Sequence, residues 1–174
     1  YQFTKFVYDD QAYDDQSSGT YDDPLIRFAE IALIYAEAKA ELGTITDADW
    51  AATVGALRKR AGITAGLDKV PTAVDPLLVK MYGNLAAPVL EVRRERTIEL
   101  MLEGQRKYDL IRWGIYVEEM NNYTKWAADE RWTKNAKAQR AASMGSYIKP
   151  MHVVLPIPSI ELGVNDLLVQ NPLW

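Results

Sequence analysis

The residues best placed to do chemistry are the charged side chains of residues 91–114, EVRRERTIELMLEGQRKYDLIRWG. Glutamate recurs there at every fourth position from Glu91 to Glu103, a spacing that puts the carboxylates on one helical face. A glycoside hydrolase needs two carboxylates beside the scissile bond, and Glu99 or Glu103 could form such a pair with Asp109. Five acids stand against six bases in the segment, however. This balance favours a network of ion pairs that holds helices in register.

Other catalytic or metal sites are poorly matched by the sequence. His152 is the single histidine, so a Ser-His-Asp triad would have to use it. Its place beside the apolar residues Val153 to Leu155 is more typical of a packed or surface residue. The chain has no cysteine for a zinc-thiolate site or a thiol nucleophile. Four early aspartates do not have the residue spacing of a calcium-binding EF-hand loop, and they are Asp9, Asp10, Asp14 and Asp15. We therefore expect no catalytic residue, no metal and no cofactor.

Aromatic side chains are the remaining candidates for a binding site. An exposed ring can stack on the apolar C–H face of a sugar while neighbouring polar groups bind its hydroxyls. Tyr123, Trp126 and Trp132 lie in a polar stretch of helical composition, which makes them candidates for such a platform. Packing inside the protein is the competing explanation for all three. Trp50 and Trp113 instead fit the buried faces of helices.

Composition limits the class of protein. A hydrophobic fraction of 48% over 174 residues is enough for a folded domain with a core. The net charge of −4 offers no basic surface for nucleic acid. No run is apolar enough to cross a bilayer, and no signal peptide is visible. Because the sequence starts at Tyr1 without methionine, we expect a fragment or a cleaved product, from which a targeting signal has been left off.

The first positioning element is a helix expected from Pro24 to Leu42, capped by Asp22 and Asp23 and ended by Gly43. Its polar residues fall on one narrow stripe and all other positions are apolar, so we expect neighbours to cover it on most sides. The polar stripe consists of Arg27, Glu30, Glu37 and Glu41.

A second helix begins at a cap formed by Thr46 or Asp47 and ends at Gly62. We expect its buried face to carry Trp50, Val54, Leu57 and Ala61. Two helices joined by a short loop form a hairpin like those of tetratricopeptide (TPR) repeats.

Later segments alternate between helix and loop. Residues 63–86 read as loop with one short helix, and a long helix is expected from Pro88 to Glu103, followed by a shorter one from Gln105 to Trp113. Strands are expected only at Phe3 to Tyr8 and at Val153 to Leu155. The predicted fold class is therefore all-α, with TPR-like helical hairpins, irregular loops and little strand.

Three blocks of the sequence resemble the SusD/RagB family of outer-membrane glycan-binding lipoproteins. The first is PLIRFAEIALIYAEAKAELG at residues 24–43. The second is ALRKRAG at 56–62, which is completed by RRERTIELMLEGQRKYDLIRWG at 93–114. The third is LPIPSIELGVNDLLVQNPLW at 155–174, similar to the closing signature of the family. The blocks occur in the order expected for the family and extend to the end of the chain.

The resemblance implies that residues 1–174 are the C-terminal part of a SusD-like domain. It implies capture of an extracellular oligosaccharide or polysaccharide without catalysis, at the cell surface of the outer membrane. It also implies a lipid anchor absent from this chain and a partner, a SusC-like TonB-dependent transporter. The parts would be an entry loop at 1–23, a TPR-like pair at 24–62, a loop at 63–86, a helix pair at 87–114, a variable helical insertion at 115–150 and the tail at 151–174. A TPR-like scaffold that binds only protein and a glycoside hydrolase remain as alternatives.

Overall fold

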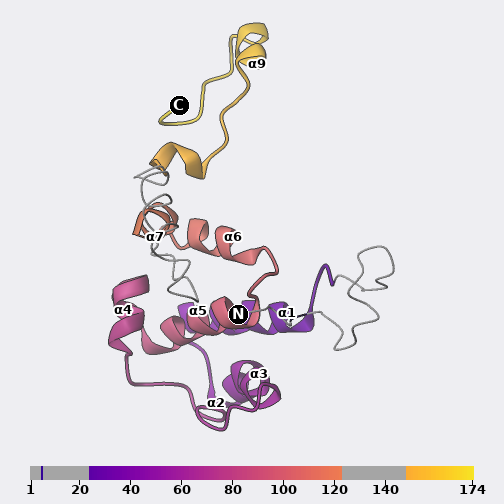
Figure 1. The fold of residues 1–174 in the computed structure, drawn as a ribbon, viewed down its shortest axis with the longest axis vertical. Helices are drawn as coiled ribbons and strands as arrows, with labels where there is room; N and C mark the ends of the chain where they lie inside the picture. The colour runs from indigo at the N-terminus through magenta and orange to yellow at the C-terminus, as the bar shows by residue number, and fades with distance from the viewer. Residues whose placement is uncertain (1–4, 6–23, 123–147) are drawn as a thin grey trace, which may run out of the picture. The chain divides into compact units, whose positions relative to one another are not determined.

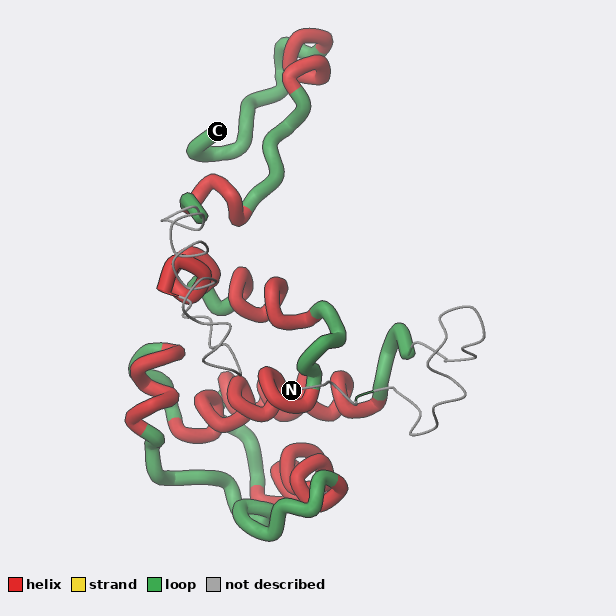
Figure 2. The backbone as a smooth tube through the Cα atoms, in the orientation of Figure 1, coloured by secondary structure: helices red, strands yellow, loops and turns green. Residues whose placement is uncertain are grey.

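The computed structural model describes Lys5 and residues 24–122 and 148–174, and these residues form helices and loops without a strand (Figures 1 and 2). The all-α prediction is confirmed for this part of the chain. The chain divides into two compact units. Unit 1 contains residues 1–75 and 85–99, and unit 2 contains residues 76–84 and 100–174.

Unit 1 is built on three helical segments. Helix α1 spans Phe28–Glu41 and packs against α5, Ala87–Glu99, and against the π-helix η2, Ala51–Gly55. Figure 1 shows α1 and α5 side by side. The π-helix joins two short helices into one continuous second arm, α2 at Asp47–Trp50 and α3 at Ala56–Arg60.

The core of unit 1 combines small and large side chains. Alanines on α1 allow close approach of its neighbours, while Leu33, Trp50 and Leu90 fill the centre and are fully buried. At the start of α2, the Thr46 side chain accepts a hydrogen bond from the Asp49 amide and the Asp49 carboxylate accepts one from the Thr46 amide. This capping box confirms the predicted helix start.

Unit 2 holds the remaining elements. Helix α4 spans Pro76–Tyr82, α6 spans Gln105–Arg112 and α7 spans Tyr116–Asn122, with α6 packing against α7. The 3-10 helix η3, Pro150–Val153, contacts α7 and is followed by α9 at Ser159–Val164.

Two expected helix boundaries and one expected strand are wrong. Helix α1 begins at Phe28, not Pro24, because Arg27 takes an extended backbone conformation and supplies no side-chain cap bond. Helix α5 ends at Glu99, not Glu103, because Leu102 adopts a left-handed φ of 68° and turns the chain. Val153 to Leu155 form the end of a 3-10 helix and an extended loop rather than a strand.

Two expectations about burial are also wrong. Among the described residues, the neighbours of helix α1 cover one of its faces, and a second apolar face is exposed. On the second arm, Arg58 is buried while Ala61 is exposed, because Arg58 extends toward two carboxylates of α5. The expected strand at Phe3 to Tyr8 falls outside the described residues except for Lys5.

Candidate functional site

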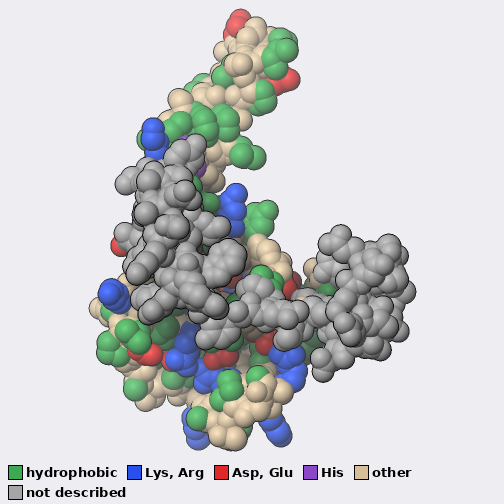
Figure 3. Space-filling model, in the orientation of Figure 1, with side chains coloured by type: hydrophobic (Ala, Val, Ile, Leu, Met, Phe, Trp, Pro, Cys, Tyr) green, Lys and Arg blue, Asp and Glu red, His purple; other side chains and the backbone are tan. Residues whose placement is uncertain are grey.

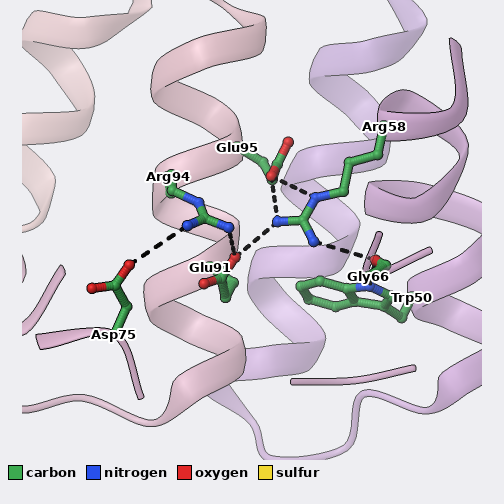
Figure 4. A network of polar contacts seen from close by, with 7 residues as sticks. All are labelled: Trp50, Arg58, Gly66, Asp75, Glu91, Arg94 and Glu95. Atoms are coloured by element: carbon green, nitrogen blue, oxygen red, sulfur yellow. Dashed lines mark hydrogen bonds and ion pairs between the residues drawn. The ribbon is translucent and has the colours of Figure 1, made fainter. Parts of the chain in front are cut away.

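The most developed polar site in unit 1 surrounds the buried side chain of Arg58 (Figure 4). Its Nε donates a hydrogen bond to Oε1 of Glu95 at 2.6 Å, and its Nη2 donates to Oε2 of Glu91 at 2.8 Å. Glu91 and Glu95 lie one turn apart on α5, so a single guanidinium bridges both carboxylates. Arg58 thereby joins the second arm to α5.

The same guanidinium also fixes a loop. Its Nη1 donates to the carbonyl oxygen of Gly66 at 3.2 Å, and the indole Nε1 of Trp50 donates to that oxygen at 3.0 Å. The guanidinium carbon lies 5.6 Å from the centre of the Trp50 ring, within cation–π distance. Gly66 has a left-handed φ of 65°, and a Cβ there would lie 2.5 Å from Nη1 of Arg58. Only glycine fits this position without a shift of the guanidinium.

The electrostatics of Arg58 follow from this geometry. Burial lowers the pKa of its guanidinium, but the hydrogen bonds to Glu95 and Glu91 outweigh this effect and raise the pKa above its usual value. Arg58 therefore remains a cation in the interior. A buried charge of this kind is stabilised only by its fixed partners.

Further ion pairs extend the network along α5. Arg94 pairs with Glu91 and with Asp75, the latter at 3.7 Å. Glu99 at the end of the helix accepts a hydrogen bond from Arg27 at 2.9 Å through one oxygen and pairs with Arg60 through the other. Two more pairs connect α5 to α1, and they are Arg96 with Glu37 at 3.5 Å and Arg93 with Glu41 at 3.1 Å.

This arrangement explains what the charged segment can do. Glu99 has both oxygens engaged by guanidinium groups, and Asp109 accepts a hydrogen bond from Nε of Arg112 at 2.9 Å. Each of these carboxylates is thus paired with at least one guanidinium group of its own unit. The geometry therefore favours the charge-network interpretation, in which carboxylates and guanidiniums position helices.

Aromatic side chains in unit 2 also lie close to guanidinium groups. The Trp113 ring lies 5.5 Å from that of Tyr82 in an edge-to-face arrangement. The guanidinium carbons of Arg112 and Arg106 lie 5.0 Å and 5.8 Å from the Trp113 ring centre. Trp113 is thus a packing residue, although it is only half-buried. Tyr108 on α6, in contrast, is 68% exposed.

The sequence-predicted platform, Tyr123, Trp126 and Trp132, lies outside the described residues. His152 is half-buried, and its Nδ1 accepts a hydrogen bond from the Lys149 amide at 3.1 Å, which closes the turn of η3. In residues 24–122 and 148–174, no group of three or more possible ligands is arranged to hold a metal ion. No helix in the described part of the chain is long and apolar enough to cross a membrane.

Sequence reasoning missed the buried role of Arg58. The available signal was the pair of glutamates four residues apart, Glu91 and Glu95, whose like charges on one helical face favour a cation between them. It also missed Tyr108 as an exposed ring, because a tyrosine inside a charged helix looks the same in sequence whether it packs or not.

Comparison with known proteins gives concordant matches. The family model described as the SusD family matches residues 1–174. The starch-binding protein SusD of Bacteroides thetaiotaomicron is 30% identical over 158 residues, which cover 89% of this chain and 22% of that protein. The SusD-like protein P25 of Formosa agariphila is 39% identical over 77 residues, or 44% of this chain and 12% of that protein.

A solved structure is similar as well. The crystal structure of a SusD homolog from Bacteroides thetaiotaomicron matches with a TM-score of 0.56 and 28% identity, over 86% of this chain and 26% of that one. The chain thus spans about a quarter or less of the length of each of these relatives.

Proposed function

This chain belongs to the SusD family, and from that premise we propose that it serves in the capture of an extracellular glycan without cleaving it. The observation that carries the proposal is the family match over residues 1–174. The relative that aligns with 89% of the chain is named a starch-binding protein, and its name describes binding rather than catalysis. An α-glucan is therefore the first ligand to test.

The role of the described residues in this function is to form a scaffold. The carboxylates of α5 are engaged by Arg58, Arg94 and Arg60, so their chemistry is used to position helices. A capture protein needs modest affinity and release of its ligand, which a hydrated aromatic surface provides. We assign that surface to Tyr123, Trp126 and Trp132, which come from a stretch of mixed polar and aromatic composition.

Delivery and location complete the proposal. The captured glycan passes to a SusC-like TonB-dependent transporter in the outer membrane, and the protein is held on the cell surface by a lipid anchor. We expect the protein, used as bait, to pull down a TonB-dependent transporter from outer-membrane extract. Recovery of the protein in the cytoplasmic fraction alone would contradict this placement.

Isothermal titration calorimetry tests glycan capture, with the polypeptide expressed from its natural gene. Malto-oligosaccharides are titrated first and a panel of other oligosaccharides second. Binding with no release of reducing sugar is expected. Trp126→Ala and Trp132→Ala should each weaken binding, because loss of one stacked ring removes about 1 kcal/mol, or roughly a factor of five in affinity. Tyr108→Ala is the matched control, since it removes an exposed ring elsewhere in the chain.

The outcomes separate the alternatives. Absence of binding to every oligosaccharide would reject glycan capture and favour a scaffold that binds protein. Release of reducing sugar would identify a glycoside hydrolase. Unchanged affinity in both tryptophan variants would keep capture and remove the two rings from the site.

A further inference from the structure

Residues 61–75, which we name the 61–75 loop, connect α3 to α4 and contain neither helix nor strand. Connections of about 12–15 residues without secondary structure are uncommon in compact domains, and such loops often carry function. Several polar side chains of the loop are exposed, and they are Thr64, Asp68, Lys69 and Thr72.

The loop is fixed to unit 1 at successive residues. The carbonyl oxygen of Gly66 accepts the hydrogen bonds from Arg58 and Trp50 described above (Figure 4). At the next residue the loop passes so close to η2 that a Cβ at Gly55 would lie 2.0 Å from the Leu67 carbonyl oxygen. The loop therefore keeps one conformation on the surface of unit 1.

Two unfavourable features of the fold meet at this loop. One is the buried guanidinium of Arg58, since removing a charge from water costs free energy. The other is the π-helix η2, a rare form of helix that is found frequently at functional sites. Departures from the most stable local arrangement are expected where a protein carries out its function. Their convergence indicates that the loop does more than connect two helices.

Asp47, the first residue of α2, holds the middle of the loop. Its Oδ2 accepts a hydrogen bond from Nζ of Lys69 at 2.7 Å, and its Oδ1 accepts one from the Val70 amide at 2.9 Å. The bond between the two side chains lowers the pKa of Asp47 and raises that of Lys69, so both groups are charged at neutral pH.

This ion pair lies at the surface. The Lys69 side chain is 81% exposed and the Asp47 side chain is 48% exposed. An ion pair as exposed as this one contributes little to the stability of a fold. Stability alone therefore does not account for the pair, and its accessible donor and acceptor groups suit the binding of a polar ligand.

The chemistry of the pair matches two adjacent hydroxyl groups. A carboxylate has about four acceptor positions and an ammonium group has three N–H donors, and the bonds of Asp47 to Lys69 and Val70 use part of this capacity. One hydroxyl group can donate to the carboxylate while its neighbour accepts from the ammonium group. Hydrogen bonds to charged groups of this kind are stronger than those between neutral groups.

The surrounding charges favour an uncharged ligand. A carboxylate or sulfate group on a sugar would be attracted by Lys69 but repelled by Asp47 and by the exposed Asp68. We propose that the Asp47–Lys69 pair binds two adjacent hydroxyl groups of a neutral sugar unit. This inference rests on the proposed capture of a glycan and adds a hydrogen-bonding contact to the stacking surface. Because the loop is already fixed, little conformational freedom is lost on binding.

Isothermal titration calorimetry of the polypeptide expressed from its natural gene tests the pair, with maltoheptaose first and other neutral oligosaccharides second. Asp47→Asn and Lys69→Met should each weaken the affinity by about threefold to tenfold, the usual effect of losing such a hydrogen bond. The double variant should lose less than the product of the two, because both side chains hold the same sugar unit.

Matched controls remove the same groups at exposed positions elsewhere. Lys59→Met lies on α3 and Asp166→Asn lies in the C-terminal tail, and neither should change the affinity. Lys69→Met keeps the bond between Asp47 and the Val70 amide, so its effect reports the sugar contact and not the anchoring of the loop.

Each other outcome decides against the site. Unchanged affinity in Lys69→Met, or equal weakening in the controls, would overturn the inference and leave glycan capture standing. If the wild-type protein binds no oligosaccharide, capture is rejected and this site with it. Unchanged sugar affinity combined with weaker pull-down of a transporter by Lys69→Met would assign the pair to a protein partner instead.

Discussion

Different kinds of polar contact stabilise unit 1 and the C-terminal tail, residues 154–174, each within itself. In unit 1 the central contacts join charged groups in the interior, as in the pairing of Arg58 with Glu91 and Glu95. In the tail, neutral side chains bind the backbone. Gln170 accepts a hydrogen bond from the Ile157 amide at 2.8 Å and donates one to the Ile157 carbonyl at 2.9 Å.

Two more bonds close the tail. The Asn171 side chain donates to the Leu155 carbonyl, and Nε1 of Trp174 donates to the Val154 carbonyl at 3.0 Å. Several apolar side chains of this segment are exposed, including Leu155 at 85% and Leu167 at 90% (Figure 3). The tail thus keeps its shape through side-chain-to-backbone bonds, with little apolar burial of its own.

The contrast shows how location determines the energetic role of a polar group. Loss of one partner of a buried ion pair leaves an uncompensated charge, whereas water replaces a lost bond at an exposed site. Figure 3 shows Lys and Arg side chains interspersed with Asp and Glu side chains over the described surface away from the tail. Unit 1 should therefore be sensitive to single charge substitutions and to acid, and the tail to neither.

Arg58→Met should give the largest effect. Methionine removes the cation from between Glu91 and Glu95 while keeping a long side chain over Trp50. We expect a loss of about 3–5 kcal/mol in the free energy of unfolding, the usual result of removing one side of a buried ion pair. Urea unfolding followed by circular dichroism measures it.

Arg60→Met is the matched control for that variant. The Arg60 side chain is 59% exposed and pairs with Glu99, so its loss should cost at most about 1 kcal/mol. Equal losses in the two variants would contradict the view that burial makes the Arg58 contacts important.

Gly55→Ala should give the next largest effect, because unit 1 is closely packed where the π-helix meets the loop. A Cβ at Gly55 would lie 2.0 Å from the carbonyl oxygen of Leu67. The loop must move away, and we expect a loss of about 1–3 kcal/mol in the free energy of unfolding. Thermal unfolding provides the measurement.

Gly163→Ala is the counterpart in the tail. This glycine lies in α9, and an added Cβ would meet nothing within 4 Å. Alanine should therefore be neutral or stabilise the protein by up to about 1 kcal/mol. Destabilisation of similar size at both glycines would show that crowding is not the difference between the two regions.

The sequence predicted the elements of unit 1 better than their surroundings. Thr46 and Gly62 gave the start and end of the second arm correctly, because capping and left-handed glycines are local properties. The balance of acids and bases also indicated the ion-pair network. The all-α fold followed from the helical periodicity.

What failed depended on contacts distant in sequence. Arg58 is buried because Glu91 and Glu95 reach it from another helix, and no pattern around Arg58 itself contains that information. Val153 and Val154 are β-branched and Leu155 is apolar, which suggested a strand, but the Trp174 side chain rather than a neighbouring strand binds the Val154 carbonyl. The proposed platform at Tyr123, Trp126 and Trp132 stays a prediction.

Gln170→Ala should produce a smaller loss than Arg58→Met or Gly55→Ala. The substitution removes the two bonds to Ile157 and a third in which Oε1 of Gln170 accepts from the Asn171 amide at 2.8 Å. Because water can replace bonds at this partly exposed site, we expect a cost of about 1 kcal/mol. Hydrogen exchange at the Ile157 amide should accelerate, while exchange in α5 stays unchanged.

Gln170→Glu separates the contribution of the accepting side-chain oxygen of residue 170 from that of its donating amide group. Glutamate keeps the oxygen that accepts from the Ile157 and Asn171 amides and loses the donor to the Ile157 carbonyl. It should therefore protect the Ile157 amide better than alanine does. Equal exchange in both variants would show that the amide is protected by something other than the Gln170 side chain.

The smallest expected effect is a difference in pH dependence at Asp49. Hydrogen bonds from the hydroxyl and amide of Thr46, together with one from the Tyr35 hydroxyl, lower the pKa of Asp49 well below its ordinary value of 3.8. Because the folded pKa is lowered, the carboxylate contributes stability above pH 3.8, and this contribution is lost as the pH falls through the folded pKa.

Asp49→Asn keeps the shape of the side chain and removes its charge. Wild-type protein should be more stable than this variant at neutral pH, by an amount that stays constant down to about pH 5 and then shrinks as the solution becomes more acidic. Urea unfolding at a series of pH values measures this gap, the difference in the free energy of unfolding between wild type and variant. For Gln170→Ala the gap from wild type should not change over the same range, because neutral groups form those bonds. A constant gap for Asp49→Asn, or a shrinking gap for Gln170→Ala, would contradict the distinction between charged contacts in unit 1 and neutral contacts in the tail.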